Sequence, residues 1–473
     1  MPKSDSMSHH ARPSSPPEAW EPLQRLVRIA GRPLERFLRI EAASGILLLV
    51  ASTVALLLAN SQWAEAYRAW WHLPLGLRAG TFEFVRPLEW YVNDGLMVVF
   101  FFVVGLEIRR EIDRGELSEW RRAALPAAAA LGGMLAPAFL YLAIAGAPPT
   151  RAGWGVPMAT DIAFAVGILT LLGKRVPPAL RVLLLAVAVI DDLGAIIVIA
   201  AFYSNGIAAS GLLVAAAALL CIFAMQRLGL RAKVAYIVPA VAAWAGVYTA
   251  GIHPTIAGVI VGLMTPVRAW LGPEGFVSEV RGELRQLSAV APTELNSHQL
   301  ADTLRHVDAA RREALSPAEA LIEMLHPWVA FIIMPIFALA NAGVQLGGDR
   351  ADAHASTIVL AVVVGLVVGK PLGVLAASTL MLKLGLARLP TGLTYKHLLV
   401  LGVVAGVGFT MALFVAQLAF HEPSLLANAK LGVLVASACA AVLAMLMGRA
   451  MLPNVVHPDA AECADDAERS TIA

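Results

Sequence analysis

The stretch VLLLAVAVIDDLGAIIVIAAF, residues 182–202, decides the fold class of this chain. It is apolar throughout except for Asp191 and Asp192, and it is long enough to cross a bilayer as one helix. A carboxylate at membrane depth costs roughly 3 kcal/mol on insertion scales, so two adjacent ones are rarely retained for structure alone. Buried neighbouring carboxylates resist ionising together, and a bound cation can replace their protons. The pair therefore predicts a site that exchanges protons for a metal ion.

The composition of the whole chain is that of a membrane protein. Of its 473 residues, 58% are hydrophobic and only 15% are charged, and the mean hydropathy is +0.71. Soluble globular proteins have a more polar composition. The net charge of +2 does not indicate a nucleic-acid partner. The cysteines at 221, 439 and 463 have neither the spacing of a zinc site nor that of a disulfide framework, so redox chemistry is not expected.

Apolar windows bounded by charged and turn residues predict twelve membrane-spanning helices. Their approximate ranges are 38–60, 92–112, 124–146, 155–173, 182–203, 210–226, 234–250, 255–267, 326–344, 356–384, 398–420 and 429–451. The short connections that this order assigns to the cytoplasm carry fourteen Lys and Arg, more than the outward connections. By the positive-inside rule, both termini are then cytoplasmic. No cleavable signal peptide precedes the first window.

The chain outside the spans forms two tails and one insert. The N-terminal tail is rich in Ser and Pro and the C-terminal tail is acidic, so both are expected to be disordered. The cytoplasmic insert has alternating charges and a helix-forming composition, which favour a small solvated helical hairpin, with a regulatory docking site as the alternative. The expected organisation is a tail at 1–34, spans one to eight within 35–267, the insert at 268–322, spans nine to twelve within 323–452, and a tail at 453–473.

Two of the predicted spans are poor continuous helices. The fourth has Pro157 four residues before Asp161, and the eleventh contains Gly402, Gly406 and Gly408. Both are expected to unwind near the middle of the membrane. Each is the middle member of a three-span group, third to fifth and tenth to twelfth, and the topology relates these groups by inversion. Paired interrupted spans in inverted repeats indicate a transporter binding site, whereas the glycines alone would more often serve helix packing.

Asp161 and Lys370 are the other charges at membrane depth. Opposed half-helix ends at the two breaks leave partial charges that the membrane cannot solvate, and nearby charged side chains can compensate them. Asp161 lies at the fourth-span break, and Lys370 lies midway along the tenth span, directly before Pro371. Two roles are open for Lys370, a salt bridge that only maintains the fold and a direct part in transport. We expect it to pair with Asp191.

Several long strings in matching order resemble the NhaA sodium/proton antiporters. They are ATDIAFA (159–165), IDDLGAI (190–196), GIHPTIAGVIVG (251–262), HPWVAFIIMPIFALANAG (326–343), GKPLG (369–373) and GVGFTMALFVA (406–416). The resemblance covers roughly residues 35 to 450. It implies an all-α polytopic protein of the bacterial inner membrane, with twelve helices in inverted-topology repeats and two broken crossing helices. It also implies electrogenic, pH-regulated exchange of sodium or lithium for protons, without a cofactor.

The resemblance assigns roles to individual residues. Asp191 and Asp192 match the family's ion and proton carboxylates, which bind the transported sodium. Asp161 and Lys370 match the charges that compensate the crossed helices, and Thr160 matches a polar neighbour of the site.

A second group of residues matches positions that sense pH or gate transport in the family: Glu107, Glu111, His253, Glu323 and Asp94. Without the resemblance, Glu107 and Glu111 are better interpreted as interfacial carboxylates paired with Arg109, Arg110 or Arg114. A lone loop histidine is likewise usually structural. The N-terminal tail and the insert are longer than expected for the family, which leaves regulation open.

Residues 75–86, LGLRAGTFEFVR, alternate as a β-strand does on both sides of Ala79-Gly80. They predict an outward β-hairpin between the first two spans. This hairpin matches the dimer contact of the family, so the resemblance implies a homodimer.

Two other classes of protein also place carboxylates in a membrane. An intramembrane aspartyl protease needs two that face each other from different helices, whereas Asp191 and Asp192 are consecutive and point about 100° apart on a helix. The chain also lacks a GxGD sequence. A cation channel is the nearer alternative, because carboxylates can line a pore. Coupling of sodium and proton movement distinguishes an antiporter from a channel, since only an antiporter must move protons when sodium is added.

Overall fold

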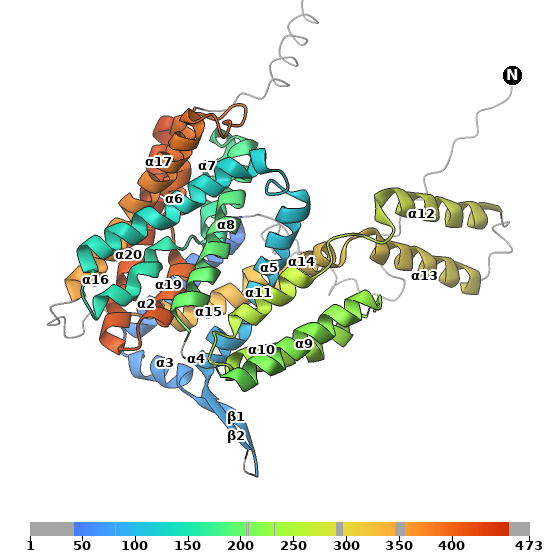
Figure 1. Ribbon diagram of the computed structural model, residues 1–473, viewed down its shortest axis with the longest axis horizontal. Coiled ribbons are helices and arrows are strands. Elements are labelled where there is room, and N and C mark those ends of the chain that lie inside the picture. The colour runs from blue at the N-terminus through green and yellow to red at the C-terminus, as the bar shows by residue number, and fades with distance from the viewer. Residues whose placement is uncertain are drawn as a thin grey trace, which may run out of the picture.

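The computed structural model describes residues 42–80, 82–204, 206, 208–230, 232–289, 297–345 and 355–453. Both expected tails, apart from Pro453, lie outside these residues. Within them, seven helices are long and apolar enough to cross a membrane, or up to ten if each bent pair is one span. The seven are Leu88–Arg114, Trp120–Ala145, Pro178–Phe202, Ala209–Arg227, Pro317–Asn341, Ala355–Lys383 and Pro423–Met451. They form one bundle, with a β-hairpin projecting from one end and a helical hairpin from one side (Figure 1).

The first part of the bundle contains the elements from α2 to α8. In chain order they are α2 (Ala42–Ala59), α3 (Ala64–Trp71), β1 (Pro74–Ala79), β2 (Phe82–Pro87), α4 (Leu88–Trp90), the π-helical η1 (Tyr91–Leu96), α5 (Met97–Arg114), α6 (Trp120–Ala145), the 3-10 helix η2 (Thr150–Met158), α7 (Ile162–Leu172), η3 (Gly173–Arg175) and α8 (Pro178–Phe202). Helix α3 was not predicted from the sequence; it turns away from α2 by 116°.

The remaining elements follow the same helical pattern. They are α9 (Ala209–Arg227), η4 (Lys233–Tyr236), α10 (Ile237–Thr249), α11 (Thr255–Met264), α12 (Gly272–Ala289), α13 (Ser297–Ala314), α14 (Pro317–Trp328), η5 (Val329–Ile333), α15 (Met334–Asn341), α16 (Ala355–Val364), η6 (Gly365–Gly369), α17 (Lys370–Lys383), α18 (Tyr395–Ala405), α19 (Phe409–Ala419) and α20 (Pro423–Met451). Each of the twelve predicted windows contains a helix, but α10 has only 13 residues and α11 only 10. A perpendicular crossing needs about 20 residues.

Glycine allows the central helices to approach each other closely. Helix α6 packs along α17, and a Cβ atom on Gly132 of α6 would lie 2.2 Å from the carbonyl oxygen of Gly373 on α17. Such small-residue contacts are the usual way in which helices associate inside a membrane. They hold the third and tenth predicted spans together beside the two interrupted ones.

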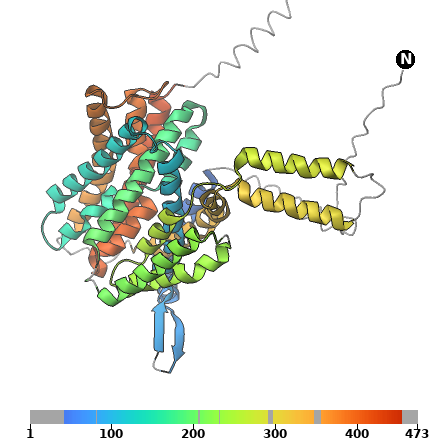
Figure 2. The same ribbon diagram turned by 45° about the vertical axis from the view of Figure 1, so that its right-hand side comes forward.

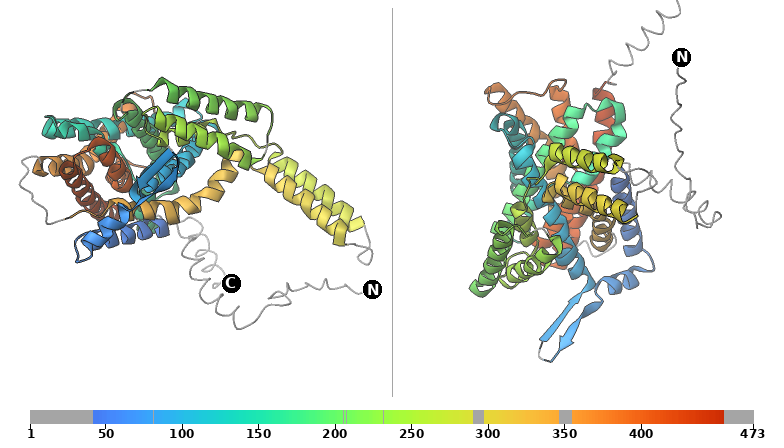
Figure 3. Two further views of the ribbon diagram at one scale, coloured as in Figure 1. Left: turned by 90° about the horizontal axis from the view of Figure 1, so that it is seen from below. Right: turned by 90° about the vertical axis from the view of Figure 1, so that its right-hand side faces the viewer.

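The β-hairpin predicted at 75–86 is confirmed. Strand β1 pairs antiparallel with β2, and Ala79 is the partner of Phe82. Gly80 has a φ of +61°, which a residue with a side chain rarely adopts, so glycine suits this turn. The hairpin points away from the helices (Figures 1 and 3). We call the end of the bundle that carries it the hairpin end.

The helical hairpin predicted within the insert is also confirmed. Helices α12 and α13 lie side by side and project from the bundle (Figures 2 and 3). His306 Nδ1 lies 3.1 Å from Glu283 Oε1 and joins the two helices. Hydrogen bonds from Arg312 and Arg311 lower the pKa of the exposed Asp308 below its ordinary value. These contacts are those of a solvated charged surface, which was the favoured interpretation of the charge pattern.

Candidate ion-binding site

The two interrupted helices meet at their breaks. Helices η2 and α7 form an angle of 44°, and α18 and α19 form an angle of 50°. The backbone N–H of Asp161 donates to the carbonyl of Val407 at 2.8 Å, and the Thr160 hydroxyl lies 3.1 Å from the carbonyl oxygen of Ala405. The unwound residues thus satisfy part of each other's backbone hydrogen bonding, as irregular backbone at membrane depth requires. Both predicted breaks are confirmed, and the residues at the two breaks contact each other.

Asp161 caps two half-helices at once. At the start of α7, its Oδ1 accepts the N–H of Phe164 at 3.0 Å. Its Oδ2 accepts the N–H of Thr410 at 3.1 Å, at the start of α19, and also the Thr410 hydroxyl. The side chain is 1% exposed. A carboxylate between two helix N-termini is stabilised by their positive dipole ends, so this position fits the compensating charge that was expected there.

Lys370 contacts the C-terminal end of a half-helix, whereas Asp161 caps N-terminal ends. Its Nζ donates to the carbonyl of Met158, the last residue of η2, and lies 2.9 Å from Asp191 Oδ2. The predicted pair between Lys370 and Asp191 is therefore present. The Thr160 hydroxyl donates to the same carboxylate oxygen at 2.7 Å. The pair is fully buried, so each charge depends on the other for its stability.

Asp192 is different, because its carboxylate has no such partners. Among the described residues, neither Oδ1 nor Oδ2 of Asp192 has a hydrogen-bond partner, and neither has Oδ1 of Asp191. Both aspartates are 1% exposed. A buried carboxylate without donors is costly, and either a proton or a cation removes that cost. Carboxylate oxygens are ligands that hard cations prefer. The described residues contain no group of three or more His, Cys, Asp and Glu that could hold a resident metal.

Asp94 and His253, distant in the sequence, lie together. Asp94 Oδ1 is 3.4 Å from His253 Nε2, and the Trp244 indole donates to the Asp94 carbonyl at 3.0 Å. The other ring nitrogen of His253 lies 2.7 Å from the Thr255 hydroxyl. The histidine is thus part of a packed polar contact between η1 and the start of α11.

The three carboxylates expected to sense pH from the cytoplasmic side are not joined in the described part of the chain. Glu107 and Glu111 lie one turn apart on α5, where Glu111 Oε2 accepts the N–H of Glu116 at 3.2 Å and Oε1 lies 3.7 Å from Arg110. Glu323 is exposed on α14. No hydrogen bond or ion pair links Glu323 to the other two in the described part of the chain. Of the three suggested arginine partners, only Arg110 contacts either Glu107 or Glu111 in that part.

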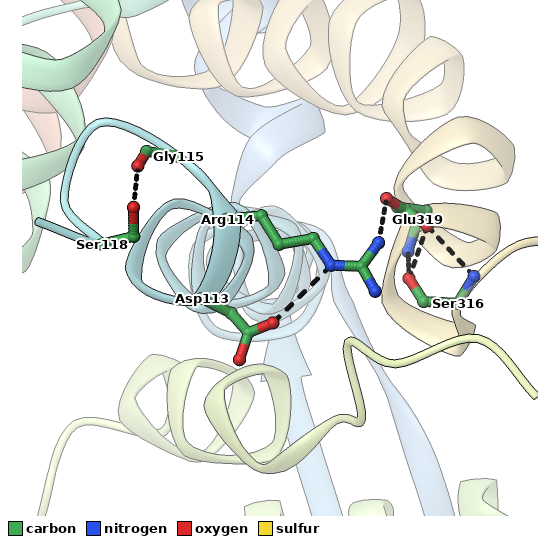
Figure 4. Close-up of polar contacts among 6 residues, drawn as sticks. All are labelled: Asp113, Arg114, Gly115, Ser118, Ser316 and Glu319. Carbon is green, nitrogen blue, oxygen red and sulfur yellow. Dashed lines mark hydrogen bonds and ion pairs between the residues drawn. The ribbon is translucent and has the colours of Figure 1, made fainter. Parts of the chain in front are cut away.

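A contact that was not predicted from the sequence joins helices α5 and α14, which carry these carboxylates. Arg114 lies 3.7 Å from Glu319, at the end of α5 and the start of α14 (Figure 4). Glu319 also forms a capping box with Ser316, in which the Glu319 N–H donates to the Ser316 hydroxyl at 3.2 Å and the Ser316 N–H donates to the Glu319 carboxylate at 3.0 Å. The Ser-x-x-Glu pattern at 316–319 was the available signal for this cap. It starts α14 nine residues before the predicted ninth window.

Thr410 was missed as well. It follows the glycine-rich break by two residues, and only the fold shows that it contacts Asp161.

The chain is similar to several known proteins. A family model described as Na+/H+ antiporter 1 matches residues 35–447. The Na(+)/H(+) antiporter NhaA 2 of Myxococcus xanthus is 69% identical over 96% of this chain and 97% of its own length. The protein of the same name from Sorangium cellulosum is 54% identical over 97% and 98%. Among solved structures, the sodium proton antiporter MjNhaP1 from Methanocaldococcus jannaschii is similar with 12% identity and a TM-score of 0.46, over 90% of this chain and 95% of that one.

Proposed function

Since the chain belongs to the NhaA family of Na+/H+ antiporters, we propose that sodium and protons compete for Asp192 and Asp191 where its two broken helices cross. The chain is a multi-pass membrane transporter and not an enzyme. The observation that carries the proposal is the contrast between the two carboxylates. Asp191 is bound to Lys370 and Thr160, whereas both oxygens of Asp192 have no hydrogen-bond partner in the described residues.

The chemistry of exchange follows from this contrast. Sodium binds only an ionised carboxylate, so Asp192 must release its proton before or as the ion enters. A cation beside Asp192 also attracts Asp191 and weakens its pair with Lys370. The buried ammonium then loses its stabilising partner and releases a second proton. Two protons would leave for each sodium or lithium ion that binds, which makes the cycle electrogenic.

The proposed topology has twelve crossings and two inverted three-span repeats. The support is that the breaks at 159–161 and 406–408 each lie in the middle of such a group and contact each other. Basic residues in the connections at 109–122, 174–181, 227–233 and 383–396 support a cytoplasmic location of both termini in a bacterial inner membrane. The helical hairpin α12–α13 then lies in the cytoplasm, and the hairpin end faces outward.

We also propose a homodimer formed through the β-hairpin. Leu77 on β1 is 76% exposed and Leu75 is 41% exposed, and a two-stranded sheet has unpaired backbone groups along its edges. A second copy could cover both features. Deletion of residues 75–86 is expected to reduce the mass of the detergent-solubilised protein to that of a monomer, as measured by light scattering. A dimer that survives the deletion would contradict this interface.

Proteoliposomes test the exchange itself. With a pH dye inside, adding sodium or lithium outside is expected to change the luminal pH, and adding potassium is not. A cation channel, the alternative function, would carry sodium current without any obligatory movement of protons. Sodium current without a change in luminal pH would therefore favour the channel.

Regulation by pH is expected to depend on Glu107, Glu111 and Glu323. A change in the charge of these carboxylates can bias the equilibrium between two conformations. Glutamine imitates the protonated form permanently. The Glu111→Gln and Glu323→Gln proteins should therefore become active only at higher pH than the wild type, before any loss of maximal rate. The measurement is the exchange rate in proteoliposomes from about pH 6 to 9, and an unchanged profile in both variants would reject this role.

A further inference from the structure

A second polar cluster lies apart from the carboxylate site. The Gln417 side-chain amide, near the end of α19, donates to Glu89 Oε1 at 3.2 Å and to Asn341 Oδ1. The Asn341 amide donates to Asn93 Oδ1 at 2.8 Å and to the carbonyl of Phe337 at 3.0 Å. Asn341 is completely buried. We call Glu89, Asn93, Asn341 and Gln417 the amide cluster.

The amide cluster lies between the ion site and the hairpin end. Glu89 follows strand β2 almost directly, so it is at the hairpin end of the bundle. Gln417 is on the same short helix as Thr410, whose hydroxyl and N–H bind Asp161 at the crossing. Gln417 follows Thr410 by seven positions, which is about 10 Å along a helix. Helix α19 thus contacts the crossing at one end and the amide cluster at the other.

The cluster joins α19 to helices outside its own repeat. Glu89 and Asn93 precede α5, and Asn341 ends α15, whereas α19 belongs to the last three-span group. Phe414, between the two ends of α19, adds ring contacts with Phe101 of α5 at 5.3 Å and with Phe337 of α15 at 6.2 Å. Separation of α19 from α5 and α15 would expose these rings and would leave the side-chain oxygen of the buried Asn341 without its Gln417 donor until water entered.

An antiporter that works by alternating access must open each side of its site in turn. We infer that Gln417 is a positioning residue which, with Glu89, Asn341 and Asn93, closes the hairpin-side route to the carboxylate site in one half of the cycle and releases it in the other. This inference rests on the proposed exchange at Asp191 and Asp192. The residues of the cluster do not bind the ion; they act through the position of α19.

The test is the Gln417→Leu variant, which retains bulk but loses both donated hydrogen bonds. A weaker closure increases the population that is open at the hairpin end, and apparent affinity follows the population of the binding-competent state. The apparent KM for sodium should fall about threefold or more at the hairpin-end surface and should rise at the opposite surface. The two values are measured in membrane vesicles of opposite orientation. General loss of structure would lower the maximal rate or move both KM values in one direction.

Two further variants make the test specific. In Glu89→Gln/Gln417→Glu the donor and acceptor of this pair are exchanged. The amides of Asn93 and Asn341 can also reverse, at the loss of the Asn341 bond to the Phe337 carbonyl, so the swap is expected to restore both KM values part of the way toward those of the wild type. The single Gln417→Glu change places two carboxylates against each other and should shift KM as Gln417→Leu does. Thr170→Val is the matched control and should leave both KM values unchanged, because within the described residues the Thr170 hydroxyl bonds to the Val166 carbonyl of its own helix.

The inference is overturned if the two KM values stay unchanged or move together in Gln417→Leu, or if the swapped double variant is as altered as the single Gln417→Glu variant. If Gln417→Leu does not reach the membrane, Gln417→Glu is compared with the double variant instead. The inference then requires that the two KM values move in opposite directions in Gln417→Glu and return toward those of the wild type in the double variant. Wild-type vesicles that show no sodium-driven proton movement would instead overturn the proposed exchange, and this inference with it.

Discussion

Asp192→Asn protein is expected to be folded and yet to move no protons when sodium is added to proteoliposomes. Asparagine has nearly the size of aspartate but can neither release a proton nor balance a cation. The oxygens of Asp192 have no hydrogen-bond partner in the described residues, so the substitution removes a buried charge without breaking a contact. Its melting temperature should therefore equal or exceed that of the wild type, because burial of an unpaired charge is costly. The rate should fall to that of liposomes without protein.

Asp191→Asn provides the matched comparison. Exchange should be lost here as well, but this substitution also removes the partner of Lys370 and leaves a buried ammonium unpaired. A lower melting temperature should accompany the loss of exchange. Wild-type rates in either variant, or equal destabilisation of both, would contradict the different environments assigned to the two carboxylates.

The second large effect is expected for Lys370→Ala. Removing one partner of a buried ion pair costs about 3 to 5 kcal/mol, because the remaining charge is uncompensated. Lys370 is completely buried and also donates to the end of η2 through the Met158 carbonyl. Thermal unfolding of the purified protein should show a clear loss of stability. The double variant Asp191→Asn/Lys370→Ala should recover much of it, because it leaves neither charge unpaired.

The electrical behaviour of the same variant separates the two roles of Lys370. If the lysine releases one of the two transported protons, its removal should reduce the charge moved per cycle, as measured by currents on a supported membrane. A destabilised variant that transports with an unchanged charge per ion would show that Lys370 only maintains the fold.

The breaks and the central ion pair could be predicted from the sequence because their cause is local. Charge is expensive at membrane depth, so Asp161, Asp191 and Lys370 were conspicuous among apolar residues, and a lysine there needs a nearby carboxylate. Proline at 157 and glycines around 406 disrupt a helix wherever it packs. The observed contact between Asp161 and Val407 follows from these features once both breaks lie at the same depth.

The missed contacts depend on which helices become neighbours. Thr410 and Gln417 are ordinary residues in their window, Glu89 lies just before the second window, and no period or motif indicates that α19 contacts both the start of α7 and α4. The Arg114 to Glu319 contact is a similar case, because it joins α5 to a helix some 200 residues later in the chain. The Ser-x-x-Glu cap at 316–319 could be predicted from the sequence, but the contact of Glu319 with Arg114 could not. Helix α3 was missed because it is too short and too polar to resemble a span.

Proton release on sodium binding tests the competition at Asp192 most directly, since it requires neither a gradient nor turnover. Sodium is added to purified protein in weakly buffered detergent solution, and the released protons are measured with a pH indicator. The wild type is expected to release protons in proportion to the sodium bound, and Asp192→Asn is expected to release fewer or none. Equal release from both proteins, or sodium binding to the wild type without any release, would contradict the account.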